Sequence, residues 1–331
     1  MIALRGAVAA LALLALSACA TVTALPPTTA PLPGWTAATA GTRPITLGLP
    51  GGARLDDGVR FAGGIEIVLD DASPLHSLSD LKLIDGEQGF VSVSDAGDLV
   101  RGRLVLDRRG RLTGVEGLQY RRLTLLDGAP IVDKVDGDAE GLLVSGGDLF
   151  VSFERNHRIW NYGALDALRE RPAEVRHPDA DFPLNDGMEG ISTGQTGGWR
   201  VTGENGGVWD CRPAACAVVV PVSAVPATDA DFRTTGLDRD PAGPGYYVLQ
   251  RLFRAPADVR AHVRHMAPDG TLGPVLVELK LPGTTDNFEG LAAVAHDGGT
   301  RLYILSDDNT SKKQRTLLLA FDLVTRPARS A

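Results

Sequence analysis

The sequence repeats one pattern five times, and this repetition limits the folds that the chain can adopt. The three clearest copies are AEGLLVSGGDLFVSFERN, MEGISTGQTGGWRVTGENG and FEGLAAVAHDGGTRLYILSDDN. Each has an acid-Gly-aliphatic step, a strand, a Gly-rich turn, a second strand and then acidic and Asn residues. LSDLKLIDGEQGFVSVSDAG and TTGLDRDPAGPGYYVLQRLF are two weaker copies with the same layout. The copies begin 46 to 61 residues apart, and such a period with several strands per unit is typical of a β-propeller.

Two positions recur in every copy, and we name them the first and second anchors. The first anchors are Ser79, Glu140, Glu189, Thr235 and Glu289. The second anchors are Asp95, Glu154, Glu204, Arg251 and Asp307. Equivalent positions of all blades of a propeller meet near one rim of its central channel. We therefore expect the first anchors around one channel mouth, with the second anchors beside them or in the next layer out.

The rest of the chain consists of short β runs divided by Gly, Asp and Pro, which predicts an all-β fold. We predict a β-propeller of five to six blades, closed by strands from both termini. The closing strands are VRFAGGIEIVLD, before the first copy, and TLLLAFDLV, after the last. One helix is predicted over residues 162–172, ending at Pro172. The alternative is a β-sandwich with accidental internal similarity, which the two recurring anchors disfavour.

The N-terminus has the build of an export signal. In MIALRGAVAALALLALSACA an apolar run follows a single Arg and is short for a transmembrane helix. LSAC resembles a bacterial lipobox, which predicts that Cys19 is the lipid anchor; ordinary signal cleavage nearby is the alternative. The predicted organisation is a signal peptide over residues 1–19, a Pro/Thr/Ala-rich tether over 20–44 and one domain over 45–331. The residue after Cys19 is Ala20, whereas an Asp there would favour the inner membrane. We therefore expect the outer membrane, with the domain facing the periplasm.

Charge and cysteine content narrow the partners. The 331-residue chain has a formal net charge of −8, whereas nucleic-acid binding needs a basic surface. We expect a monomer whose only membrane contact is the N-terminal lipid. Cys211 and Cys216 are predicted to form a disulfide, because an exported chain meets an oxidising compartment. The rival, a metal knuckle, lacks a second cysteine pair or a histidine cluster.

The anchors are rich in carboxylates, which points to a metal. Several carboxylates that converge at low dielectric need something to offset their charge. A hard cation with oxygen ligands, calcium first, is the predicted partner. The predicted ligands are Glu140, Glu189, Glu289, Asn287, Asp307 and Asn309. The alternatives are backbone N–H groups, nearby arginines, raised pKa values, or glutamates that merely bond the backbone of neighbouring blades.

Several segments, taken in order, resemble the phytase-like domain family, described as "esterase-like activity of phytase" proteins. They are NDGMEGIS, TTGLDRDPAGPGYYVLQRLF, TDNFEGLA, LYILSDDN and QRTLLLAFDL. The resemblance covers residues 58–325 and implies an exported propeller with phosphoesterase or esterase activity. The more distant β-propeller phytases use calcium to bridge acidic side chains and substrate phosphate, with Lys and Arg completing the pocket.

On this resemblance, we expect metal-assisted hydrolysis of a small-molecule ester substrate. The expected catalytic residues are Glu140, Glu189 or Glu289 as the base that activates water, and Arg251 as counter-ion or as a fork for phosphate or carboxylate. The predicted substrate-binding residues are Arg155, Arg251, Glu154, Glu204 and Asn205. Further basic candidates are Lys312, Lys313 and Arg315. The alternative function is a non-catalytic envelope propeller that binds a small ligand or a partner protein.

Two other motifs are expected to have structural roles. GISTG fits the G-x-S-x-G nucleophile pattern, but Ser192 lies at a predicted strand and not at a strand-turn-helix elbow. His262 and His265 are expected on opposite sides of a strand, where they cannot share a metal.

Overall fold

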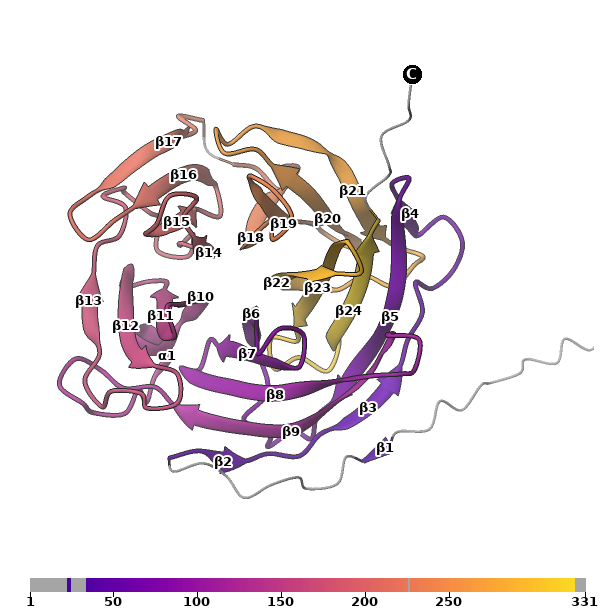
Figure 1. The fold of residues 1–331 in the computed structure, drawn as a ribbon, viewed down its shortest axis with the longest axis horizontal. Helices are drawn as coiled ribbons and strands as arrows, with labels where there is room; N and C mark the ends of the chain where they lie inside the picture. Colours follow the sequence, from indigo (N-terminus) through magenta and orange to yellow (C-terminus); the bar gives the residue numbers. More distant parts are fainter. Residues whose placement is uncertain (1–22, 25–33, 226, 325–331) are drawn as a thin grey trace, which may run out of the picture.

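The computed structural model describes residues 23–24, 34–225 and 227–324, and it contains five blades arranged around a central axis (Figure 1). Blade 1 consists of β6 (Leu78–Ile84), β7 (Gly89–Ser94), β8 (Asp98–Leu106) and β9 (Leu112–Arg122). Blade 2 consists of β10 (Ala139–Ser145), β11 (Asp148–Phe153), β12 (Arg158–Ala164) and β13 (Ala173–Val175). Blade 3 consists of β14 (Gly190–Thr193), β15 (Trp199–Thr202), β16 (Gly206–Cys211) and β17 (Cys216–Val222).

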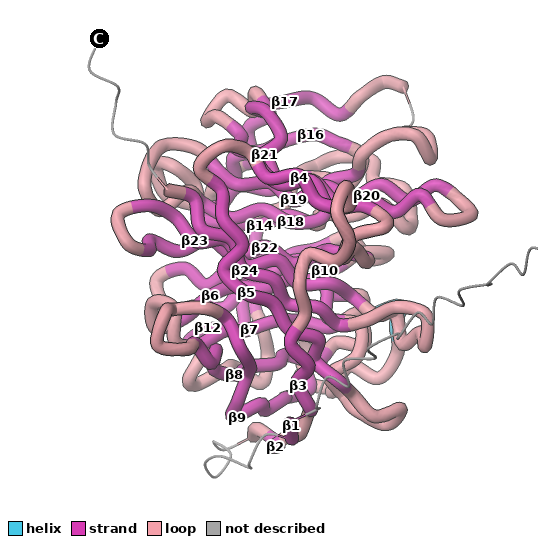
Figure 2. The backbone as a smooth tube through the Cα atoms, turned by 90° about the vertical axis from the view of Figure 1, so that its right-hand side faces the viewer, coloured by secondary structure: helices cyan, strands magenta, loops and turns pink. Residues whose placement is uncertain are grey.

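Blades 4 and 5 each use strands from the N-terminal part of the chain. Blade 4 consists of β18 (Arg233–Arg239), β19 (Tyr246–Arg254), β20 (Asp258–Met266), β21 (Leu272–Lys280) and β4 (Ala53–Leu55). Blade 5 consists of β22 (Asn287–His296), β23 (Gly299–Asp307), β24 (Thr316–Leu323), β5 (Val59–Val68) and β3 (Gly41–Pro44). The side view in Figure 2 shows the flank of the ring where β4 leads into β5.

The ring is closed by strands from both ends of the chain, as predicted. Strand β5 pairs antiparallel with β24, so blade 5 combines both predicted closing segments. The inner strands β6, β10, β14, β18 and β22 pack against one another in cyclic order. A buried hydrophobic cluster fills each of the five interfaces between neighbouring blades. The all-β propeller is therefore confirmed, with five blades.

The predicted boundary between tether and domain is wrong, because part of the segment 20–44 packs on the propeller. Strand β3 pairs with β5, β2 (Thr36–Ala37) pairs with β9, and β1 (Thr23–Ala24) pairs with β3. Trp35 is buried, and the guanidinium of Arg101 lies 4.5 Å from its ring centre. The buried ring of Trp35 and backbone pairing thus hold the segment 34–44 on the propeller, although it is poor in apolar residues. Cys19 and the signal peptide lie outside the described residues.

The predicted helix over residues 162–172 is also wrong. Tyr162 belongs to β12 and is buried between blades 1 and 2, where its hydroxyl donates to the carbonyl of Thr124. Burial of this ring outweighs the local helical pattern of the sequence. The only helix among the described residues is α1 (Lys134–Gly137), and none is long and apolar enough to cross a membrane.

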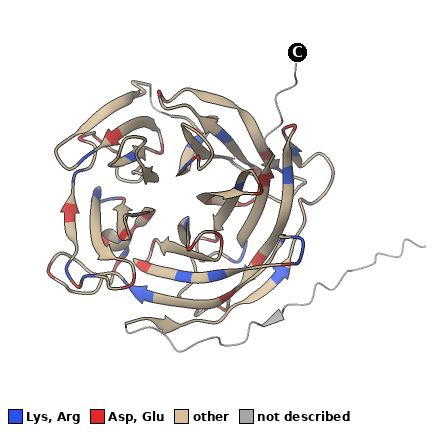
Figure 3. Cartoon of the chain, in the orientation of Figure 1, with Lys and Arg blue, Asp and Glu red and all other residues tan. Residues whose placement is uncertain are grey.

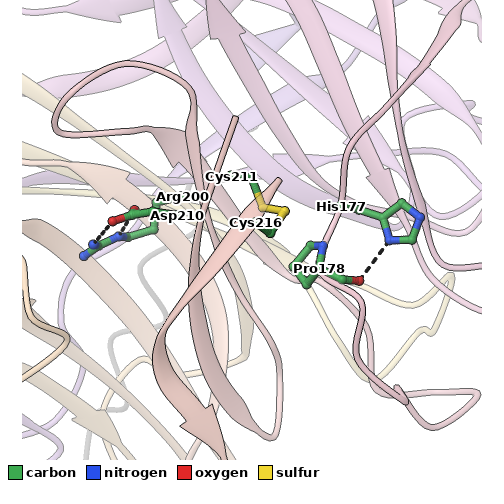
Figure 4. Close-up of a disulfide and its surroundings, with 6 residues drawn as sticks. All are labelled: His177, Pro178, Arg200, Asp210, Cys211 and Cys216. Atoms are coloured by element: carbon green, nitrogen blue, oxygen red, sulfur yellow. Dashed lines mark hydrogen bonds and ion pairs between the residues drawn. A yellow bond between two sulfur atoms is a disulfide. The ribbon is translucent and has the colours of Figure 1, made fainter. Parts of the chain in front are cut away.

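The predicted disulfide is present. Cys211 and Cys216 join the facing ends of β16 and β17 on blade 3 (Figure 4). The bond therefore closes the hairpin of the outermost two strands of this blade.

Buried polar side chains link neighbouring inner strands around the axis. The carboxylate of Asp80 on β6 accepts hydrogen bonds from the backbone N–H of Leu142 on β10 (3.0 Å) and of Leu291 on β22 (3.3 Å). The ammonium of Lys82 lies 2.8 Å from this carboxylate and donates to the carbonyl of Leu291. Burial raises the pKa of Asp80 to about 6, while Lys82 lowers it. Blades 1, 2 and 5 are therefore tied together by one ion pair.

Asp238 on β18 makes the corresponding links on the other side of the ring. It accepts from the backbone N–H of Ala293 on β22 (2.8 Å) and from the hydroxyl of Ser192 on β14 (2.9 Å). Blades 3, 4 and 5 are joined in this way. Ser192 has the expected structural role.

We predict that Lys82→Met lowers the free energy of unfolding by about 3–5 kcal/mol at pH 7, because it leaves a buried carboxylate without its cation. Urea unfolding measures the change. Lys312→Met is the control, since its pair with Asp71 is more than 80% exposed at both side chains and should contribute nothing measurable. Equal stability of the two variants would contradict a structural role for the buried pair.

Candidate functional site

The first anchors owe their orientation to a β-bulge at the start of the inner strands. The register shifts across Ser79, Glu140, Thr235 and Glu289 in blades 1, 2, 4 and 5. In blade 3, Glu189 directly precedes the first paired residue of β14. A bulge leaves one residue out of the ladder and re-aims its side chain. The recurring step in the sequence is therefore the signature of the bulge.

The glycine after an anchor allows neighbouring inner strands to approach. A Cβ atom on Gly141 of blade 2 would lie 2.7 Å from the carbonyl oxygen of Glu189 in blade 3. A Cβ atom on Gly236 of blade 4 would lie 2.7 Å from the carbonyl oxygen of Glu289 in blade 5. Both distances are too short for a side chain. In the acid-Gly pair, the acid lies at the bulge and points out of the ladder. The glycine lets the inner strand of the neighbouring blade approach, which brings the anchor carboxylate of that blade near.

Two overlapping carboxylate groups form where blades 2 and 3 meet the axis. Asp138, Glu140 and Glu154 have oxygens that all lie within 4.8 Å of one another, and so do Glu154, Glu189 and Glu204. Glu154 is shared by both groups, which we call the acidic triads. In Figure 3, acidic segments (red) occur on elements near the central opening as well as on the outer loops.

Glu140 and Glu189 have nothing to neutralise them within hydrogen-bond distance. Among the described residues, no side chain or backbone group donates a hydrogen bond to either carboxylate. Glu189 is only 6% exposed. Burial raises the pKa of Glu189 well above its usual value, and the charges of Glu204 and Glu289 raise it further. Burial has the same effect on Glu140, reinforced by Glu189 and Glu289. The explanation that these glutamates bond neighbouring backbone does not hold for this pair.

A second group of anchors, around Arg251, is partly neutralised. Its Nη2 lies 3.4 Å from both Glu204 and Glu289, and its Nη1 donates to Asn287 (2.6 Å). The amide of Asn287 donates to Glu289 (2.9 Å) and reaches Asp307 at 3.5 Å. Arg251 is therefore a counter-ion for two anchors, although its buried Nε has no hydrogen-bond partner among the described residues.

The acidic second anchors of blades 2, 3 and 5 have raised pKa values. Burial and the neighbouring Asp138 raise the pKa of Glu154 to about 7. Burial raises the pKa of Glu204 to about 8, against the opposing effect of Arg251 and Arg233. Burial and Glu289 raise the pKa of Asp307 well above its usual value.

The other predicted site residues lie around this centre. Arg155 pairs with Asp138 and so borders the first triad. The side-chain amide of Asn205 donates to Asp186, and its buried oxygen has no partner in the described part of the chain. Asn309 is exposed, and its backbone N–H donates to Asp307. The predicted metal ligands are thus split: Glu140 and Glu189 lie in the triads, whereas Glu289, Asn287 and Asp307 lie around Arg251.

Sequence reasoning missed Asp138, which belongs to the first triad and is 1% exposed. It also missed Asp186, which binds Arg233 at 2.7 Å beside Glu204. The sequence did contain a signal for them. An Asp precedes the acid-Gly step by two or three residues in DAEG, DGMEG and DNFEG.

His262 and His265 have no part in the site. His262 stacks on Phe232 and lies 3.6 Å from Glu278, whereas His265 contacts Tyr247 and Asp240. They occupy opposite faces of β20, as expected.

The acidic triads have a metal-ligand composition. Their carboxylate oxygens lie close together, and two of the carboxylates, Glu140 and Glu189, have no hydrogen-bond donor among the described residues. This arrangement matches the preference of calcium for many oxygen ligands in flexible geometry. The residues present therefore fit a hard divalent cation.

With divalent cations chelated, we predict that the free energy of unfolding falls as the pH rises from about 5 to about 8. The folded chain keeps protons on Glu154 and Glu204 that the unfolded chain has already released, because their folded-state pKa values are raised to about 7 and about 8. Each carboxyl contributes at most about 1.4 kcal/mol per pH unit. Urea unfolding across this range measures the slope. Glu204→Gln should flatten it, and an identical slope in the variant would contradict the raised pKa.

Comparison with known proteins finds one family and several solved structures of low sequence identity. The sequence matches a family model over residues 73–310, a span that contains all five inner strands and both sets of anchors. A search of curated proteins finds no match.

The solved structures similar to this chain share little sequence with it. The major allergen Mala s 1 of Malassezia sympodialis is 12% identical, with a TM-score of 0.42 over 93% of this chain and 95% of that one. The endo-arabinase of Bacteroides thetaiotaomicron is 11% identical, with a TM-score of 0.43 over 78% and 96%. The α-L-arabinanase of Cellvibrio cellulosa, complexed with arabinohexaose, is 13% identical, with a TM-score of 0.42 over 73% and 91%. At these scores the fold assignment rests on the strand pairing itself.

The family match is of a different kind, because it spans more than two thirds of the residues and includes every anchor. The chain therefore belongs to the phytase-like family, whose description is "esterase-like activity of phytase".

Proposed function

We propose that this propeller is a metal-assisted hydrolase that cleaves a small phosphoric or carboxylic ester at the acidic triads. The observation that carries the proposal is the convergence of Glu140 and Glu189 on Glu154 without any hydrogen-bond donor to the first two. A purely structural carboxylate would be expected to have a donor when it is buried. The family description supports an ester as the substrate.

The residues that would hold the cation are those of the triads: Asp138, Glu140, Glu154, Glu189 and Glu204. A bound calcium ion would supply Lewis-acid polarisation of the ester oxygen. It would also favour the charged forms of these carboxyls, whose pKa values are raised in its absence.

Within this site, the general base is best sought among the triad carboxylates. Glu289 is already held by Asn287 and Arg251, so its oxygens are less free to accept a proton. Glu140 and Glu189 have free oxygens, and either can take the proton of the attacking water. Arg251 is positioned beside Glu204 to stabilise negative charge that develops on the ester.

A non-catalytic propeller that binds a small ligand or a partner protein is the second candidate. The observation that favours it is the neutralisation already present, since Arg251, Arg233 and Lys134 pair with acidic residues of the site.

The location follows from the lipobox resemblance. We propose that Cys19 anchors the chain to the outer membrane and that the propeller faces the periplasm, where it would meet small esters.

We predict that the domain lacking residues 1–22 hydrolyses p-nitrophenyl phosphate, bis-p-nitrophenyl phosphate or p-nitrophenyl acetate in a calcium-dependent way. Glu189→Gln should lower kcat at least about 100-fold, because loss of a general base or metal ligand costs that much. Glu289→Gln tests the alternative base. Glu116→Gln is the control, since Glu116 lies on the outer strand β9 and pairs loosely with Arg103 at 3.8 Å. Absence of turnover on all three esters would favour the binding propeller.

A second prediction concerns metal binding without turnover. Calcium at 100 times its Kd should raise the free energy of unfolding by about 2.7 kcal/mol. Glu154→Gln should abolish most of this gain, because Glu154 is common to both triads. Urea unfolding with calcium and with chelator measures it. Equal stability of the wild-type protein in the two conditions would refute the metal site.

A further inference from the structure

A pocket of about 730 Å³ lies between blades 4 and 5 beside the acidic site. One wall comes from the end of β19 and the hairpin that follows it, and the other from the start of β22 and the loop over residues 309–315. Arg251 and Asn287 belong both to this pocket and to the anchor group described above. A molecule bound in the pocket would therefore touch the side chains that contact Glu204 and Glu289.

One wall of the pocket is apolar and open to solvent. Phe253 is 58% exposed and Leu281 is 53% exposed, and Pro256 and Val259 complete this surface. Large apolar side chains gathered at an exposed concave surface are typical of ligand-binding grooves.

The opposite wall carries polar groups without partners. The hydroxyl of Thr285, a residue that is 6% exposed, makes no hydrogen bond with any described residue. On the first wall, Arg251 of β19 has a buried Nε that also has no hydrogen-bond partner among the described residues. The ammonium of Lys313 makes no ion pair within the described part of the chain.

Arg315 gives this wall a fixed geometry. Its Nε donates to Asp286 (3.1 Å) and its Nη2 to the carbonyl of Thr285 (3.2 Å). Asp286, the only carboxylate among the described residues that line the pocket, is thus already paired. The donors left without a partner are the Thr285 hydroxyl, the Lys313 ammonium and the Nε–H of Arg251. A hydroxyl and cationic N–H groups together recognise an oxyanion.

We propose that this pocket binds a small oxyanion, carboxylate or phosphate-like, that carries an apolar substituent. The anionic group lies toward Thr285, Arg251 and Lys313, and the substituent packs on Phe253 and Leu281. The pocket also predicts the substrate of the proposed hydrolase, and this step rests on that proposed function. The preferred substrate is an ester with an anionic part and an apolar part. Binding in the pocket itself requires no metal.

Calorimetric titration of the soluble domain in chelator tests the proposal apart from hydrolysis. The probes are hexylphosphonate and methylphosphonate, which are not cleaved, with heptanoate and acetate as the carboxylate pair and hexanol as the uncharged control. Hexylphosphonate should bind at least about tenfold more tightly than methylphosphonate, because each buried methylene favours binding about fourfold. Heptanoate should exceed acetate if carboxylates are accepted, and hexanol should bind more weakly than either long-chain anion.

Matched variants locate the binding. Lys313→Gln should weaken hexylphosphonate about two- to fivefold, the range of partly exposed ion pairs. Phe253→Ser should weaken it at least about fivefold through loss of the aromatic surface. The controls are Lys312→Gln, which removes the neighbouring charge outside this pocket, and Val218→Ser, which removes an exposed apolar side chain on blade 3. Both should leave the affinity unchanged.

The outcomes separate the two proposals. Equal affinity for the hexyl and methyl probes, or equal loss in variants and controls, overturns the pocket whatever the hydrolysis assay gives. Selective binding of the hexyl probe without any calcium-dependent hydrolysis supports the pocket and removes the proposed enzyme. The comparison of probes uses the wild-type protein, so it decides even if a variant fails to fold.

Discussion

The five inner strands of the propeller each present one edge to the central axis, where no strand of their own sheet can hydrogen-bond to them. Backbone groups buried in such a place need other partners. Asp80, Lys82 and Asp238 supply them by bonding backbone groups of β10 and β22 and the hydroxyl of Ser192 on β14. These side chains connect all five blades, so the geometry of the rim depends on them.

The anchors at the rim are a consequence of the same crowding. Gly141 and Gly236 bring neighbouring inner strands close, and the bulge before each glycine turns the preceding side chain out of the ladder. Where that side chain is Glu, carboxylates gather within a few ångströms of one another. The repeat that builds the fold therefore also concentrates negative charge, and the pKa values of Glu140 and Glu189 rise because little in the protein offsets it.

The blades differ in how far they neutralise this negative charge, so one part of the rim is more acidic than the other. Blades 2 and 3 hold the acidic triads, whereas blade 4 replaces the second-anchor acid by Arg251. Beyond Arg251, the pocket between blades 4 and 5 has cationic donors and an apolar wall. A cation and an organic anion would thus be favoured on adjacent parts of one surface. This arrangement suits a ligand that has both a metal-binding group and an apolar tail.

The sequence by itself determined the propeller and its anchors, because the repeat shows their local pattern in five copies. It also determined closure by both termini and the disulfide, because these depend on strand-forming segments at each end and on two cysteines close together in the chain. Only the tertiary structure decided which anchors meet. Glu154 joins Glu140 to Glu189 because blades 2 and 3 are neighbours, whereas Glu289 is held by Arg251 and Asn287. Asp138, Trp35 and Tyr162 were misjudged or missed for one reason: their roles arise from burial against residues distant in the sequence, which local spacing does not encode.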